Sequence, residues 1–221
     1  MNSASKKPNV NYLLKQASKF EKNGSLARAK NKFKQVLSEY PKNKTALKAL
    51  QDIEAKLKYF PITHPEKDTV IKLWKLLEHS HLDEVVAKTK NLIKKFPDSY
   101  ILWHILGAAY FSSNNLNYAK YAYGNVLELQ PDFAEGYNNL GSVLFRLGNL
   151  DRAVQVLEKA ITLRQDYAEA LNNLGLVYYK KNNYERACRY FTQVTILKKN
   201  VSEYQLNLGN SLLNQGKLDE A

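Results

Sequence analysis

The stretch AEGYNNLGSVLFRLGNLDRAVQVLEKAITLRQDY, residues 134–167, decides the fold, because its pattern recurs on both sides at one fixed spacing. Four glycines follow one another at intervals of 34 residues, namely Gly107, Gly141, Gly175 and Gly209. Four alanines keep the same interval, namely Ala119, Ala153, Ala187 and Ala221. A period of about 20 to 50 residues is typical of repeat proteins, in which each unit buries its apolar face only against its neighbours. The sequence therefore predicts a stack of repeated units.

Each unit is predicted to contain two antiparallel helices. In its first half the apolar residues step by three and four positions, at Tyr137, Leu140, Val143, Leu144 and Leu147. The second half, from Leu150 onward, repeats these steps at Ala153, Leu157, Ala160 and Ile161. Steps of three and four place side chains on one face of a helix. We therefore expect an all-α fold, a single elongated solenoid of helix pairs.

The chain must reverse between the two helices of a unit. A helix commonly ends on a residue in the left-handed region, where side chains other than those of Gly and Asn cost about 1–2 kcal/mol. The equivalent position in successive units is occupied by Gly24, Ser80, Asn114, Gly148, Asn182 and Gly216. Ser80 alone departs from the preferred residue types. We expect all six residues to adopt a positive φ angle.

The repeated glycines at 107, 141, 175 and 209 lie inside the first helix of each unit. Glycine in a helix interior costs roughly 1 kcal/mol relative to alanine, so a compensating contact is needed. We predict that each glycine faces the small alanine of the second helix, which lets the two backbones approach closely.

The pattern Leu140, Gly141, Leu144, Ala153, Leu157 and Ala160, repeated as Leu174, Gly175, Tyr178, Ala187, Phe191 and Val194, resembles the tetratricopeptide repeat. The terminal proline of that repeat is present as Pro41, Pro97 and Pro131, whereas Gln165 and Lys199 replace it later. The resemblance implies a right-handed superhelical solenoid of antiparallel helix pairs. It also implies that the first helices line a concave groove that binds a protein segment.

The predicted domain organisation has four parts. Residues 1–9 are polar and expected to be disordered, and residues 10–58 form a diverged, basic repeat unit followed by an extra helix. The two prolines of YFPITHP, residues 59–65, predict a hinge or linker, since proline breaks helices. Residues 66–221 form the repeat array, with units at 66–99, 100–133, 134–167 and 168–201 and a partial unit at 202–221. Because the last unit stops early, we expect a longer protein to continue past it.

The charge of the chain is concentrated at one end. Residues 1–60 carry 14 Lys and Arg against 4 Asp and Glu, or +10 of the total of +12. Such a segment attracts phosphates, so RNA binding by the first 60 residues is one hypothesis, and a solvated basic face is the alternative. No stretch approaches the roughly 20 apolar residues of a membrane span, and no signal peptide is evident. We expect a cytoplasmic protein in which the single cysteine, Cys188, is packed or idle.

Catalytic and metal-binding patterns are weak in this sequence. His79 and His81 lie two residues apart at a predicted turn, without the cysteine or carboxylate cluster of a zinc site. We find no glycine-rich phosphate loop and no nucleophile elbow. We therefore predict no catalytic residue, no metal site and no cofactor within these residues.

The candidate binding residues lie on the predicted first helices. Asn side chains recur in the NNLG motif and its equivalents, at Asn138, Asn139, Asn172, Asn173 and Asn207, and aromatic residues recur at Phe111, Phe145 and Tyr179. A carboxamide offers both donors and an acceptor, so a column of them suits the backbone of an extended peptide. The arrangement resembles the Asn ladder in the repeat arm of protein O-linked N-acetylglucosamine transferases. The alternatives are hydrogen bonds within the stack for the Asn residues and packing of the inner wall for the aromatic residues.

Three functions are consistent with this sequence. The first is a scaffold that binds an extended peptide or protein segment in the groove without chemistry of its own. The second, based on the resemblance, is the substrate-recruiting arm of a larger glycosyltransferase or sulfotransferase whose catalytic domain lies beyond residue 221. The third is RNA binding through the basic N-terminal 60 residues. We favour the scaffold, because the groove positions carry no catalytic constellation.

Overall fold

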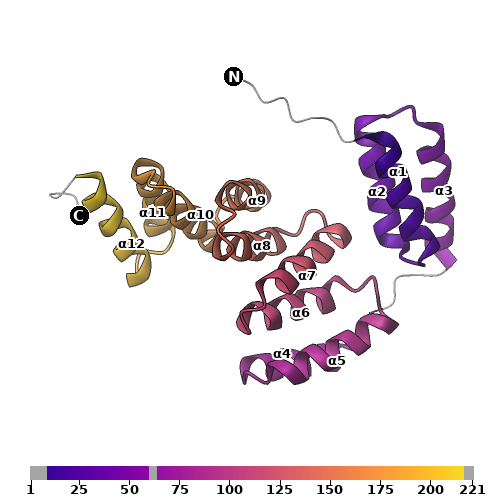
Figure 1. Cartoon of the computed structure of the whole chain (residues 1–221), viewed down its shortest axis with the longest axis horizontal. Helices are drawn as coiled ribbons and strands as arrows, with labels where there is room; N and C mark the ends of the chain where they lie inside the picture. Colours follow the sequence, from indigo (N-terminus) through magenta and orange to yellow (C-terminus); the bar gives the residue numbers. More distant parts are fainter. Residues whose placement is uncertain (1–8, 60–63, 217–221) are drawn as a thin grey trace. The chain divides into compact units, whose positions relative to one another are not determined.

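A computed structural model describes residues 9–59 and 64–216, and every regular element within these ranges is a helix (Figure 1). The helices are α1 (Val10–Lys22), α2 (Leu26–Glu39), α3 (Lys44–Tyr59), α4 (Lys67–Glu78), α5 (Leu82–Lys95), α6 (Tyr100–Ser112), α7 (Leu116–Leu129), α8 (Ala134–Arg146), α9 (Leu150–Leu163), α10 (Ala168–Lys180), α11 (Tyr184–Leu197) and α12 (Ser202–Gln215). The predicted disorder of residues 1–8, most of the predicted hinge and the predicted helix start near Ala221 lie outside the described residues.

The helices keep the period of the sequence. The second helices α5, α7, α9 and α11 begin at Leu82, Leu116, Leu150 and Tyr184, each 34 residues after the last. The first helices α6, α8, α10 and α12 begin at Tyr100, Ala134, Ala168 and Ser202, again 34 apart. The predicted all-α solenoid of helix pairs is therefore confirmed.

The chain forms two compact units. One comprises residues 1–105 and 128–131, and the other comprises residues 106–127 and 132–221. The boundary therefore falls inside α6 and near the end of α7, while the hinge predicted at 59–65 stays a prediction.

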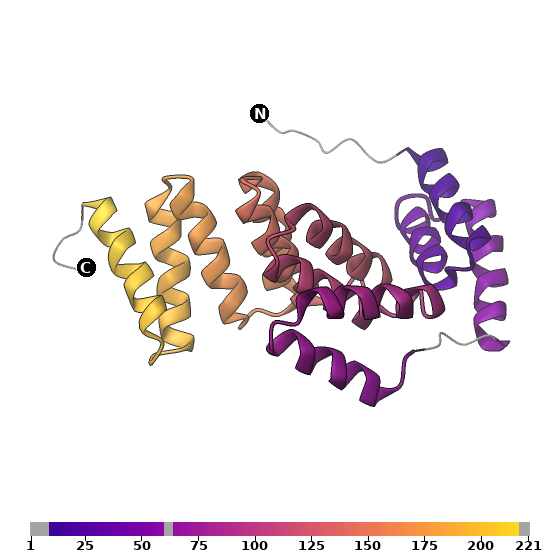
Figure 2. The same cartoon turned by 60° about the horizontal axis from the view of Figure 1, so that its bottom comes forward.

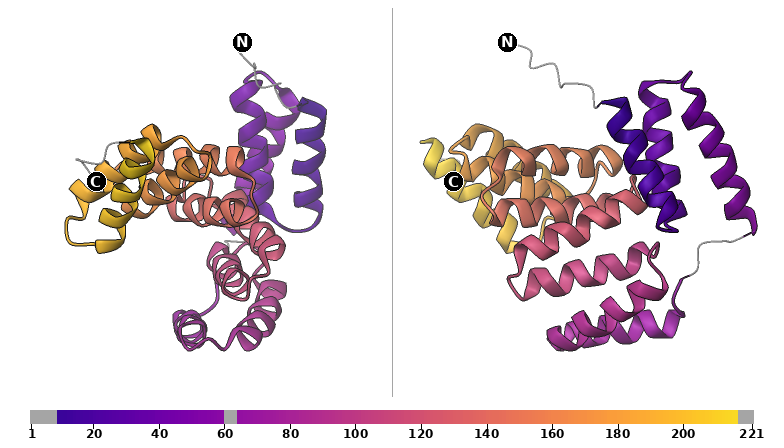
Figure 3. Two further views of the ribbon diagram at one scale, coloured as in Figure 1. Left: turned by 60° about the vertical axis from the view of Figure 1, so that its left-hand side comes forward. Right: turned by 45° about the vertical axis from the view of Figure 1, so that its right-hand side comes forward.

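In the first unit, α1, α2 and α3 pack around a core of their own (Figure 3). Phe33, Val36 and Ile53 are almost completely buried there, together with the small residues Ala17 and Ala29. These residues recur every three or four positions, which is the spacing of one helix face. The apolar pattern predicted for residues 10–58 thus forms a packed three-helix core.

Side chains from distant parts of the first unit satisfy the open ends of two helices. The Ser25 hydroxyl donates to the Asp98 carboxylate, which also accepts from the Ala27 backbone N–H at 3.2 Å. At the end of α7, the Asn31 side-chain amide donates to the backbone carbonyls of Glu128 at 2.8 Å and Leu129 at 3.1 Å. The first N–H groups and last carbonyls of a helix have no partner within it. These contacts therefore replace local capping.

In the second unit, α8 to α12 follow one another as alternating antiparallel helices (Figure 2). Their core combines large side chains, led by Leu157, Leu174 and Phe191, with the fully buried Ala153 and Ala187. Because the core residues come from two successive pairs, neither pair can bury its apolar face alone.

The predicted turn geometry is confirmed at all six positions. Gly24, Gly148 and Gly216 have φ angles of 74°, 75° and 82°. Asn114 and Asn182 adopt 59° and 57°, and Ser80 adopts 61° despite its residue type. The backbone path of the repeat therefore determines the conformation at this position, even where the side chain disfavours it.

The predicted contact of the repeated glycines is wrong in its partner. A Cβ atom on Gly141 would lie 2.5 Å from the side chain of Leu157, and one on Gly175 would lie 2.5 Å from Phe191. At Gly107 the nearest side chain is Tyr123, at 2.8 Å. Each glycine therefore makes room for a large residue four positions after the alanine. The period places the two helices correctly, but it does not show which residues face each other across them.

Candidate functional site

The first helices α8, α10 and α12 present one recurring surface, which we call the first-helix face. Its nine residues are half-buried or exposed and form three rows at the repeat spacing: Asn139, Asn173 and Asn207; Ser142, Leu176 and Asn210; Phe145, Tyr179 and Leu213. Within each helix these positions are three residues apart, so they lie on one side of it. Because the repeat returns the same position on each helix, any ligand on this face meets similar side chains in succession.

The Asn residues divide into two positions with different environments. Asn138 and Asn172 are buried, with 7% and 6% of their surface exposed. Asn173 donates to the Oδ1 atom of Asn138 at 2.8 Å, and Asn207 donates to the Oδ1 atom of Asn172 at 3.0 Å. The second Asn of each unit thus binds the first Asn of the preceding unit. This ladder joins successive units, which is the structural alternative for these residues.

The ladder changes what Asn173 offers to a ligand. Its amide nitrogen donates a second time, to the Ser142 hydroxyl at 3.0 Å, so both N–H groups are in use. Its Oδ1 atom accepts no hydrogen bond from the described residues, and a carboxamide oxygen has two lone pairs. Asn173 therefore presents an acceptor on the first-helix face, held in place by two donors.

The predicted aromatic residues also contact the following unit. The guanidinium group of Arg146 lies 4.6 Å from the ring centre of Phe111 and donates to the side chain of Asn114 at 2.8 Å. The Tyr179 hydroxyl accepts from the Asn214 amide at 3.0 Å. Phe111, Phe145 and Tyr179 all remain partly exposed. The aromatic row therefore packs between units and still offers apolar surface.

Charged side chains flank the first-helix face. Glu135, Glu169 and Glu203 occupy the first turn of α8, α10 and α12, where a carboxylate is favoured by the positive end of the helix dipole. All three are exposed, and neither Glu169 nor Glu203 forms an ion pair with a described residue. The first turns thus give this end of the face a negative potential.

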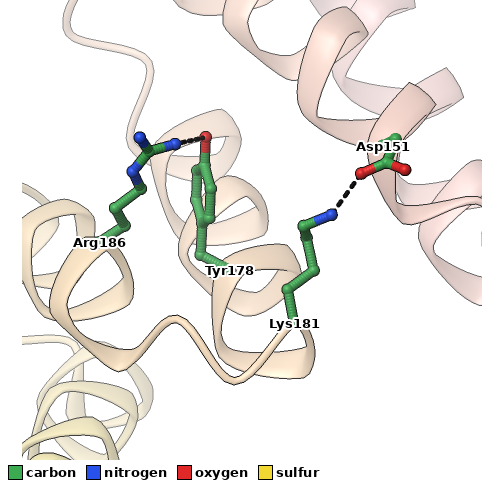
Figure 4. A network of polar contacts seen from close by, with 4 residues as sticks. All are labelled: Asp151, Tyr178, Lys181 and Arg186. Atoms are coloured by element: carbon green, nitrogen blue, oxygen red, sulfur yellow. Dashed lines mark hydrogen bonds and ion pairs between the residues drawn. The ribbon is translucent and has the colours of Figure 1, made fainter. Parts of the chain in front are cut away.

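A second set of polar contacts links the pairs α8–α9 and α10–α11 near their turns (Figure 4). The ammonium group of Lys181 donates to the Asp151 carboxylate at the start of α9. Arg186 donates to the Tyr178 hydroxyl at 3.2 Å, and this hydrogen bond raises the pKa of the guanidinium group. The Tyr178 ring stacks on that of Tyr190, with centroids 5.6 Å apart. These contacts support the packing of the units and leave the first-helix face open.

Two searches of residues 9–59 and 64–216 concern other kinds of site. No group of three or more His, Cys, Asp or Glu side chains in these ranges is arranged to hold a metal ion. Within the same ranges, no helix combines the length and apolar character needed to cross a membrane. The side chain of Cys188 is buried, with 8% of its surface exposed.

Sequence reasoning missed two contributors to the inter-unit contacts. Ser142 accepts from Asn173, and Asn214 donates to Tyr179. Both pairs are separated by nearly one repeat, 31 and 35 residues, so the period itself held a signal. Polar residues separated by about one repeat on first helices are candidates for such contacts.

Comparison with known proteins identifies the repeat. The family model described as "TPR repeat" matches residues 107–148 and 141–182. Two models described as "Tetratricopeptide repeat" match residues 168–200 and 12–43. A search of curated protein sequences gave no match. The matches at 12–43 and 107–200 cover the diverged first unit and most of the repeat array.

Solved structures share the fold at low sequence identity. A crystal structure of MamA is 23% identical, with a TM-score of 0.63, over 72% of this chain and 90% of MamA. PilF of Pseudomonas aeruginosa is 20% identical, with a TM-score of 0.62, over 67% and 68%. The first TPR of Spaghetti, solved bound to the HSP90 peptide SRMEEVD, is 20% identical, with a TM-score of 0.52, over 53% and 93%.

These matches do not show the expected similarity to the repeat arms of glycosyltransferases and sulfotransferases. They do agree with the helix pairs, the positive-φ turns and the glycine contacts. The chain belongs to the tetratricopeptide repeat family.

Proposed function

We propose that this protein is an interaction scaffold that binds an extended protein segment across the first-helix face of α8, α10 and α12. The observation that carries the proposal is the apolar row Phe145, Tyr179 and Leu213, which stays partly exposed on three successive helices. A row of apolar side chains at regular spacing offers successive contacts to the alternating side chains of an extended segment. The TPR of Spaghetti, which binds a peptide, is a precedent within the fold.

The Asn row supports backbone recognition in a narrower form than a full ladder of free carboxamides. Asn138 and Asn172 are buried and act between units, so we assign peptide contact to Asn139, Asn173 and Asn207. At Asn173 the available group is the Oδ1 acceptor, which suits a backbone N–H of the ligand. Recognition of backbone groups is independent of the ligand's side chains, so the Asn row provides affinity without sequence preference.

The charge of the face favours one class of ligand. The carboxylates of Glu169 and Glu203 lack counter-ions among the described residues and lie on the same helices as the apolar row. Complementary charge raises association rates and rejects ligands of the same charge. We therefore propose a segment that combines apolar residues with Lys or Arg. An acidic C-terminal tail is disfavoured here.

The test uses a displayed library of random 12-residue peptides, selected on the whole chain. Packed helix axes lie roughly 8–10 Å apart, so three first helices span about 18 Å, the length of about five extended residues. Twelve residues therefore cover the face. Selected peptides are expected to be enriched in apolar and basic residues, and their affinity is then measured by fluorescence anisotropy.

A matched pair of variants locates the binding surface. Leu213 belongs to the apolar row and is 48% exposed, whereas Ile196 lies on the second helix α11 and is 65% exposed. Leu213→Glu is expected to weaken binding of the selected peptides at least tenfold, or about 1.4 kcal/mol, and Ile196→Glu less than about twofold. The proposal fails if no peptide is enriched or if the two variants weaken binding equally.

The hypothesis of RNA binding by residues 10–58 is not advanced, because nothing in the structure favours it. Some of the basic side chains there form ion pairs, Lys30 with Glu54 at 3.0 Å and Lys56 with Glu21 at 2.7 Å. The predicted cytoplasmic location and the transferase-arm hypothesis likewise stay predictions.

A further inference from the structure

The α4–α5 hairpin contains a pocket of about 410 Å³ on a different surface from the first-helix face. It is lined by Lys72, Lys75, Leu76, His79, His81 and Lys88. Three of these residues are lysines, two are histidines and none is acidic. The pocket therefore combines an apolar floor at Leu76 with cationic walls.

The lysines occupy positions that are apolar in the inner repeats. Lys72 aligns with Leu106, Leu140 and Leu174, and Lys75 aligns with Ala109, Val143 and Val177. Leu174 and Val177 are fully buried in the core that α10 shares with α8 and α9. In α4 both aligned residues are exposed. The sequence thus replaces a surface for packing against a neighbouring helix pair by a charged one.

A solvated terminal face explains why this surface is polar, but not why its charges have one sign. Residues 64–99 carry seven lysines against six Asp and Glu, a net charge of +1. A random arrangement would mix both signs in the pocket. Instead the lining holds three lysines and no carboxylate. The charge of a nearly balanced hairpin is therefore segregated.

Two of the three ammonium groups are available to a ligand. Lys88 pairs with Glu84 at 2.6 Å, whereas Lys72 and Lys75 form no ion pair with any described residue. They lie three positions apart on α4 and so project from the same side of the helix. Like charges held close together repel each other, and an anion placed between them removes that repulsion.

We infer that this pocket binds an acidic segment of a partner protein, with carboxylates at Lys72 and Lys75 and an apolar side chain over Leu76. This site is separate from the first-helix face, whose Glu residues favour a basic ligand. The protein would then hold two segments of opposite charge, or two partners, on different surfaces. Because the probes and variants differ, the two proposals succeed or fail independently.

The test measures binding of a fluorescently labelled ten-residue poly-glutamate peptide to the whole chain by anisotropy. The double variant Lys72→Glu with Lys75→Glu is expected to weaken binding at least tenfold, since it reverses both charges in the pocket. Both residues are exposed, so the fold should tolerate the change, and circular dichroism checks this.

The matched control is Lys67→Glu with Lys94→Glu, which makes the same charge change in the same hairpin outside the pocket. Its effect on the peptide is expected to stay below about twofold at 150 mM salt, where surface charges more than about 8 Å apart are screened. Equal weakening by both variants would mean that net charge alone attracts the peptide and would overturn the proposal. Absence of binding to the unmodified chain would do the same.

Two competitors decide the class of ligand. Inorganic phosphate at millimolar concentration should displace the peptide only weakly, because it makes no contact with Leu76. A twelve-residue uridine RNA should compete less well than unlabelled poly-glutamate. Tighter binding of the RNA, lost in Lys72→Glu with Lys75→Glu, would assign the pocket to nucleic acid and overturn the proposal.

Discussion

The α4–α5 pair and the α10–α11 pair share one backbone period but differ in which side chains they bury. Within α10, eight residues are buried, whereas within residues 67–78 of α4 only Leu73 is. Both pairs keep the positive-φ turn, at Ser80 and at Asn182. The period of the backbone therefore survives where the apolar pattern of the repeat does not, and the side chains decide whether the surface stacks or stays open.

The same two pairs reverse a size relation inside the core. In α10–α11 the small Gly175 faces the large Phe191, and Gly141 faces Leu157 in the same way. At the aligned positions of α4–α5 the first helix carries the large residue, Leu73, and the second carries the small one, Thr89. Both are buried, at 2% and 0% exposure. Since cores tolerate changes that conserve total volume, the reversal keeps the helices at a workable distance.

The largest expected effect comes from the large member of the inner pair. Phe191→Ala should lower the free energy of unfolding by about 3–5 kcal/mol, because Phe191 is fully buried and leaves a cavity. At the aligned position Thr89→Val should instead stabilise by about 1 kcal/mol, since the buried Thr89 hydroxyl has no hydrogen-bond partner. Urea unfolding measures both. Equal losses in the two variants would show that the pairs do not differ as described.

The next effect concerns glycine. Gly175→Ala should destabilise by about 1–3 kcal/mol, because its new Cβ atom would meet the Phe191 ring. Gly124, inside α7, has no heavy atom within 4 Å of the corresponding position, so Gly124→Ala should stabilise by about 0.5–1 kcal/mol. Thermal unfolding distinguishes the two signs. A gain in stability from Gly175→Ala would contradict the close contact.

The Asn ladder gives a smaller effect that sharpens the comparison of units. Asn173→Ala removes the donor to Asn138 and leaves a buried oxygen unpaired, so we expect a loss of at least about 1 kcal/mol. Asn210, exposed in the middle row of α12, is the control, and Asn210→Ala should change stability by less than about 0.5 kcal/mol. An unchanged stability for Asn173→Ala, with weaker peptide binding, would return Asn173 to a purely ligand-binding role.

The smallest expected effect is at the turn of the outer pair. Ser80 holds a φ angle of 61°, which glycine adopts without strain, so Ser80→Gly should stabilise by about 1 kcal/mol. Gly148→Ser, at the aligned turn between α8 and α9, should destabilise by a similar amount. Changes of the same sign in both variants would show that the two turns are not equivalent.

These comparisons show what the sequence makes predictable. The helix pairs and turns followed from the spacing, because the period and the left-handed turn depend on residue type at one position. The partner of Gly141 did not, since two candidates, Ala153 and Leu157, lie one turn apart on the same face of α9. The division of the Asn pairs into a buried and a half-exposed member needed the packing of neighbouring units. The pocket at Lys72 and Lys75 was visible only as a departure from the repeat until the α4–α5 hairpin was assembled.

The account is tested most directly by methyl NMR of the whole chain titrated with a selected 12-residue peptide. Binding across the first-helix face predicts chemical-shift changes at Leu176 and Leu213 and none at Ile196, which lies on the second helix α11. Shifts centred on Ile196 and Leu197, with Leu176 and Leu213 unchanged, would contradict the assignment of the binding surface.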